Sequence, residues 1–128
     1  MEPGGSGVLE FGLVQVLTAL GRAGAKSGWS CTDLDYVSKD DPDVPVLQRA
    51  MTPGQTVSGT ELIDGLGPSL QIVEGRFTGL DEEGEAWVVV RAVHGAWWEV
   101  WSDNKWVHDA IRAHFRVVED LPQDDATP

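Results

Sequence analysis

Basic residues are scarce in this chain. Its 128 residues include nine Lys and Arg against 21 Asp and Glu, which gives a formal net charge of −12 and an isoelectric point near 4.4. The basic residues stand singly in the sequence. Because nucleic acids and anionic membranes are bound through clustered Lys and Arg, we expect no direct binding to either. The same charge favours encounter with a basic partner.

Cysteine is limited to one residue. Cys31 has no partner for an intramolecular disulfide, and a single thiol is typical of a reducing compartment. Residues 1–7 lack the positively charged segment that opens a secretory signal. The longest uncharged apolar stretch, residues 11–21, is too short to span a bilayer. We therefore expect a cytoplasmic protein without a membrane span.

Motifs for metal, nucleotide or catalytic chemistry are missing as well. His108 and His114 are six residues apart, whereas a zinc pair on a helix needs a spacing of three or four. Asp33 and Asp35 begin like a calcium loop, but Val44 stands where the bidentate glutamate is required. No glycine-rich segment both follows a predicted strand and opens a helix. We expect no metal, no cofactor and no catalytic residues.

The length and composition predict one α+β domain. With 41% hydrophobic residues, 128 residues can bury a core without disulfides. We expect a flexible N-terminus over residues 1–7, a single domain over residues 8–121 and a disordered acidic tail over residues 122–128. Leucine and valine recur at helical spacing over residues 8–25, which predicts an amphipathic helix with Gly28 as its C-terminal cap.

The second half of the chain predicts a three-stranded antiparallel meander. Three segments are rich in β-formers: residues 70–79, 86–93 and 96–101. The dipeptide His94-Gly95 predicts a two-residue turn between the last two. A second helix over residues 104–115 and a short strand over residues 116–119 follow. The predicted fold is an N-terminal helix packed on a three- to four-stranded antiparallel sheet, with a β-meander followed by a C-terminal helix.

The middle of the chain has the least regular pattern. Residues 29–67 contain several prolines and a group of aspartates, and only residues 46–51 and 60–64 indicate short helical turns. We expect a long, partly ordered excursion here, a kind of segment that often carries a binding surface.

Tryptophan is the most unusual feature. There are six, and four of them fall between Trp87 and Trp101. In a strand, Trp97 and Trp101 point to one face with Glu99 between them. One interpretation is that this face is buried under the first helix. The other is an aromatic contact surface rimmed by acid, which Trp106 at the start of the second helix would extend.

These features together predict a small acidic protein that binds or inhibits a basic protein partner, as a monomer or a homodimer. The predicted partner-binding residues are Trp97, Glu99, Trp101, Asp103, Trp106, Asp33, Asp35, Asp40, Asp41 and Asp43. In size, charge and mixed topology the chain is similar in type to small bacterial immunity proteins, which block basic toxins, although no motif carries the resemblance. The alternatives are a dimeric chaperone or adaptor that uses the aromatic sheet face, an acidic mimic of nucleic acid, and an enzyme of unknown class.

Overall fold

The computed structural model describes residues 4–8, 13–38, 44–66, 70–94, 97–114 and 118–121. Within these residues the strands are β1 (Gly4–Val8), β2 (Gly28–Ser38), β3 (Val57–Ser58), β4 (Leu70–Leu80), β5 (Ala86–Val93), β6 (Trp97–Ser102) and β7 (Val118–Leu121). The helices are α1 (Leu13–Lys26), α2 (Pro45–Met51), α3 (Gly59–Gly65) and α4 (Lys105–His114). No helix in this part of the chain is long and apolar enough to cross a membrane.

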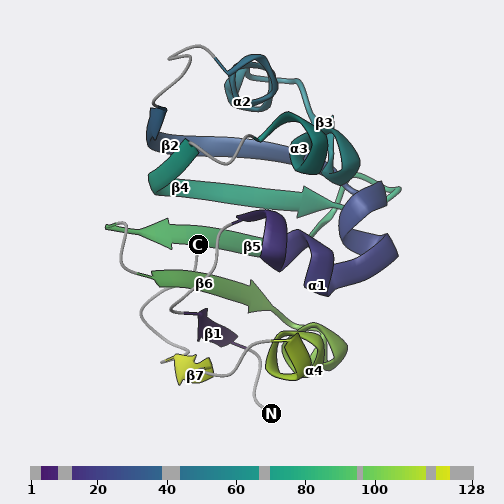
Figure 1. Ribbon diagram of the computed structural model, residues 1–128. Coiled ribbons are helices and arrows are strands. Elements are labelled where there is room, and N and C mark those ends of the chain that lie inside the picture. The colour runs from purple at the N-terminus through teal and green to yellow at the C-terminus, as the bar shows by residue number, and fades with distance from the viewer. Residues whose placement is uncertain are drawn as a thin grey trace.

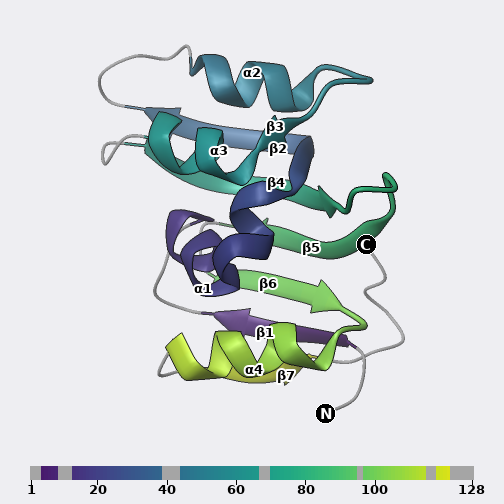
Figure 2. The ribbon, with the colours of Figure 1, turned by 90° about the vertical axis from the view of Figure 1, so that its right-hand side faces the viewer.

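The described strands form one seven-stranded sheet in the order β3-β2-β4-β5-β6-β1-β7 (Figure 1). All pairs of neighbouring strands among the described residues are antiparallel. Helices α1, α3 and α4 lie on one face of the sheet, and α2 lies along the edge formed by β2 (Figure 2). The fold is therefore α+β with an antiparallel sheet, as predicted.

The predicted order of helix, meander and helix is confirmed in α1, in β4-β5-β6 and in α4. The predicted count of three to four strands is too low, because the sequence pattern did not indicate β1, β2 or β3. Val93 pairs with Trp97 at the last described position of the β5–β6 ladder. Gly95 of the predicted two-residue turn, and Ala96 after it, lie outside the described residues.

The N-terminal segment differs from the flexible one predicted. Residues 4–8 form β1, which pairs with β6 on one side and with β7 on the other. Glycine is a poor β-former because it has no side chain to pack and loses much chain entropy. Here the hydrogen bonds to two neighbouring strands oppose that cost. Residues 122–128, predicted as a disordered tail, lie outside the described residues.

Helix α1 begins at Leu13 rather than at residue 8, and its buried stripe is the one that the spacing predicts: Leu13, Val16, Leu17 and Leu20. Gly21 interrupts the helix with φ 67° and ψ −143°, a conformation readily adopted only by glycine. Gly28, predicted as the helix cap, instead opens β2. Leu9, expected on the same stripe, lies outside the described residues.

Much of the predicted excursion is regular structure. β2 occupies residues 28–38, with its pairing to β4 irregular between Thr32 and Asp35. The two short helical turns predicted near residues 46–51 and 60–64 are present as α2 and α3. α3 begins with a capping box, in which the Ser58 side chain accepts from the Glu61 backbone and the Glu61 side chain accepts from the Ser58 backbone.

The core lies between the helices and the adjacent sheet face. Cys31, Phe77, Val90 and Val100 form one cross-strand row of this face, and all four are buried. The helix layer is close-packed where α1 meets α3. A Cβ atom at Gly59 would overlap the Gly24 carbonyl oxygen, so this contact requires glycine.

Candidate binding site

Glu99 and Trp101, the centre of the predicted contact surface, are buried. They are 8% and 6% exposed. They alternate along β6 with Trp98 and Val100, which belong to the core under the helices, so they occupy the opposite face of the sheet. This placement differs from both interpretations of the sequence. Glu99 and Trp101 are buried, so they are not an exposed contact surface, and they lie on the sheet face opposite to the first helix, so that helix does not cover them.

The Glu99 side chain ties this cluster together. Its Oε1 accepts the Trp101 indole N–H at 3.1 Å and lies 3.4 Å from the Arg91 guanidinium. On β1, Gly5 and Gly7 pair with Trp101 and Glu99, so these neighbours contribute no side chain beside the cluster. The carboxylate thus neutralises an arginine and satisfies a buried donor. This is a structural role.

The remaining predicted residues do not come together. Asp33 and Asp35 are exposed on β2, and strands β4 and β5 lie between β2 and β6. Asp103 and Trp106 are exposed at the start of α4. Asp40, Asp41 and Asp43 lie outside the described residues, and of Trp97 only the backbone is described. The acidic β2 region and the tryptophans of β6 therefore do not form one surface.

The structure instead pairs Trp106 with Trp87. β5 contains one extra residue, Trp87, between its pairings with Gly79 and Leu80 of β4, which is a β-bulge. A bulge turns a side chain out of the regular alternation. Trp87 consequently reaches α1 and α4, and its ring stacks on Trp106 with centroids 5.5 Å apart and planes inclined by 24°.

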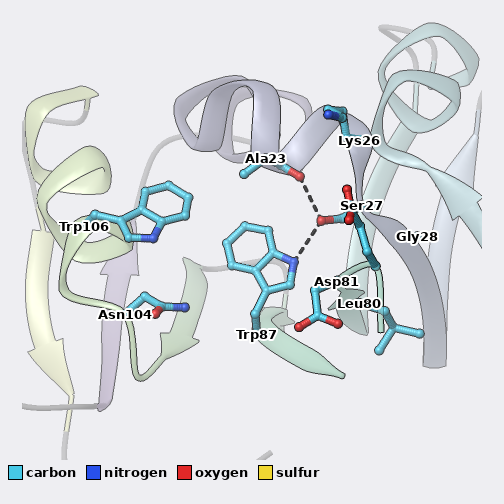
Figure 3. A pocket seen from close by; sticks show the side chains of 10 residues that line it. Ala23, Lys26, Ser27, Gly28, Leu80, Asp81, Trp87, Asn104 and Trp106 are labelled. Carbon is cyan, nitrogen blue, oxygen red and sulfur yellow. Dashed lines mark hydrogen bonds between the residues drawn. The ribbon is translucent and has the colours of Figure 1, made fainter. Parts of the chain in front are cut away.

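Trp87 is held from the side of α1 (Figure 3). Its indole N–H donates to Ser27 Oγ at 2.8 Å, and the Ser27 hydroxyl donates to the Ala23 carbonyl at 2.8 Å. Trp106 is 45% exposed and packs against Trp87 from the side of α4. The pair thus consists of an anchored inner ring and an accessible outer ring.

The two rings border a pocket of about 370 Å³, which we call the tryptophan pocket (Figure 3). Its wall combines the two indoles with charged and polar groups: Trp87, Trp106, Lys26, Asp81, Glu82 and Asn104. Asp81 Oδ1 accepts the backbone N–H groups of Glu83 and Glu85 at 2.9 Å each, which fixes the turn between β4 and β5. An aromatic platform beside carboxylates suits a ligand that is both planar and cationic.

Trp87 was not among the predicted site residues, because its apolar run predicted a strand covered on both faces. The signal that could have indicated it is the acidic turn that ends two residues before it. Four of the five residues from 81 to 85 are acidic. An apolar residue this close to such a turn lies at the solvated end of its strand, where an aromatic ring can remain accessible.

Reactive groups outside this pocket give little basis for chemistry. Burial raises the pKa of the Cys31 thiol to about 12, so the thiol is not ionised near neutral pH. His108 is buried, and its Nε2 lies 2.9 Å from the Ser102 carbonyl oxygen, where it links α4 to the end of β6. Within the described ranges, no three side chains of His, Cys, Asp or Glu gather as metal ligands would.

Comparison of the chain with protein-family models, with curated proteins and with solved structures gives no match.

Proposed function

We propose that this protein binds a basic protein partner and that the tryptophan pocket is the centre of the contact. The observation that carries the proposal is the exposed Trp106 ring, stacked on the anchored Trp87 beside the carboxylates of Asp81 and Glu82. Tryptophan is enriched among the residues that contribute most to protein interfaces, in particular where its surroundings are rigid.

The charge of the chain supports the choice of partner. A net charge of −12 attracts a basic protein over distances set by the ionic strength. The acidic turn of residues 81–85 concentrates part of that charge beside the pocket. Long-range attraction would raise the association rate, and burial of Trp106 would slow dissociation. Inhibition of a basic toxin, the role of immunity proteins, is one form of such binding.

The proposal is tested by differential capture. Wild-type protein, Trp106→Ala and Val37→Ala would each be immobilised and exposed to the same cell extract. The proteins that each of them retains would be identified by mass spectrometry. Val37 is the matched control, because it is also an apolar side chain, 56% exposed, but lies on β2. We expect at least one basic protein to be retained by the wild type and by Val37→Ala, to be lost with Trp106→Ala, and to elute as the salt concentration rises.

Two results would count against the proposal. If the proteins lost with Trp106→Ala are neutral or acidic, the partner chemistry is misassigned. If Trp106→Ala and wild type retain the same basic proteins with the same salt dependence, the contact lies elsewhere on the molecule.

A further inference from the structure

Resting on the proposed function, we propose that the tryptophan pocket receives one arginine side chain of the partner. The guanidinium would lie on the indole wall formed by Trp87 and Trp106 and pair with the carboxylate of Asp81 or Glu82, and Figure 3 shows Asp81 next to Trp87. Both kinds of group line the same pocket. The contact would therefore combine a cation–π interaction with a charge-assisted hydrogen bond.

The size of the pocket favours a single side chain. Its volume of about 370 Å³ lies near the lower end of the range of roughly 300–1,000 Å³ found for ligand pockets. One of its walls is a pair of flat indole rings, which suits a flat group better than a bulky apolar one. A planar group inserted against this wall would cover much of the exposed Trp106 surface.

The chemistry favours arginine over lysine. A guanidinium is planar, is less strongly hydrated than an ammonium group, and presents paired N–H donors that match a carboxylate. It can stack on an indole while its edge donates to an oxygen. An ammonium group is a compact charge that retains more of its water and has no flat face, so its gain from the same wall is smaller.

Two lysines lie near the pocket and oppose a cation. Lys105 is paired with Asp109 at 3.5 Å, which offsets its charge locally. Lys26 is exposed at the end of α1 and lines the pocket directly. Against it stand the four acidic residues of the turn at residues 81–85. The sum of these charges around the pocket is negative. Lys26 also tests the sign of the ligand, because removal of its positive charge should strengthen binding of a cation.

The test uses the full chain and three small probes: N-acetyl-arginine amide, N-acetyl-lysine amide and N-acetyl-citrulline amide. Citrulline has nearly the shape of arginine without its charge. Binding is followed through the indole N–H signals of Trp87 and Trp106 in ¹H–¹⁵N NMR spectra. We expect the arginine probe to shift both signals in a saturable way. The lysine and citrulline probes should each bind several-fold more weakly.

Four variants locate the contact. Trp106→Ala should weaken binding of the arginine probe about fivefold, the upper part of the range for an exposed cation–π contact. Asp81→Asn and Glu82→Gln each remove one charge, and at least one should weaken it about threefold. Asparagine keeps the Oδ1 acceptor that fixes the turn, so the fold of the turn is retained. Lys26→Met should strengthen binding about twofold.

The outcomes separate this inference from the function on which it rests. Equal binding of arginine and citrulline, or of arginine and lysine, overturns the assignment of a guanidinium. Absence of any shift in the Trp87 and Trp106 signals also overturns it. If a basic protein is nevertheless lost with Trp106→Ala, the proposed function stands and only the arginine assignment fails. If the arginine probe shifts neither indole signal and no basic protein is lost with Trp106→Ala, both the arginine assignment and the proposed function fail.

Discussion

Replacement of Ser27 by alanine tests how the site is built. The Ser27 hydroxyl accepts the Trp87 indole N–H and donates to the Ala23 carbonyl, both at 2.8 Å. The Ala23 carbonyl keeps a second donor, the Ser27 backbone N–H at 3.1 Å. Loss of the hydroxyl bond to this carbonyl therefore costs little free energy. Loss of the acceptor for a partly buried indole costs more. We expect a total loss of about 1.5 kcal/mol in unfolding free energy.

Thr18→Ala is the matched control for this variant. The Thr18 hydroxyl donates to the Val14 carbonyl at 2.8 Å, the same local bond four residues back, but it is exposed and joins no other element. We expect a change below about 0.5 kcal/mol, because alanine also favours the helix. Both variants would be measured by urea unfolding followed by far-ultraviolet circular dichroism.

A double-mutant cycle isolates the bond between Ser27 and Trp87. Trp87→Phe removes the donor and keeps an aromatic ring. If the two side chains are coupled, the double variant should be less destabilised than the sum of the single variants by about 1 kcal/mol. A coupling energy near zero, or a Ser27→Ala effect no larger than that of Thr18→Ala, would refute the view that Ser27, just after the end of α1, anchors Trp87.

Three further substitutions test the packing and the buried charges. Gly59→Ala should lower the unfolding free energy by about 3 kcal/mol, because its Cβ meets the Gly24 carbonyl; a loss below about 1 kcal/mol in urea unfolding would contradict this close approach. Glu99→Ala should cost about 2–3 kcal/mol in the same assay and Glu99→Gln about half as much, since glutamine keeps an acceptor for Trp101; equal losses would show that the charge alone matters. The pKa of Cys31 is raised from 9.0 to about 12, so unfolding releases its proton above pH 9 and stability should fall with pH between 9 and 12 by up to about 1.4 kcal/mol per unit. Cys31→Ala should flatten this slope in unfolding measured across that window, and an unchanged slope would assign it to other groups.

The parts of the fold that the sequence predicts are those with a strong local pattern. The helical spacing of α1 selects the residues that this helix buries, and the β-rich segments are present as β4, β5 and β6. β5 differs from the predicted strand covered on both faces, because Trp87, Val89 and Arg91 on it are only half-buried. β1 has no such pattern, because a glycine-rich strand is stabilised by its two neighbours rather than by its side chains. Pairing between distant segments leaves no local signal, so the meander β4-β5-β6 could be predicted but the places of β1, β2, β3 and β7 in the sheet could not.

The candidate site was only half predictable for a similar reason. Trp106 lies off the buried stripe of α4, and its exposure follows from helical spacing. The position of Trp87 depends on the bulge in β5, which arises from the register with β4. Strict alternation would have left Trp87 on the other sheet face. One extra residue in a strand therefore brings together the two rings that form the pocket.

The two acidic regions of the described chain have different structural settings, and this is why the site is assigned to only one of them. β2 pairs with β3 at Gly28 and Trp29, and α2 lies along its outer side. Asp33, with φ 55°, and the exposed Asp35 stand where the pairing of β2 with β4 is irregular. Asp81 and Glu82 instead line a pocket together with Trp87 and the exposed Trp106, a ring that the fold does not need for its core.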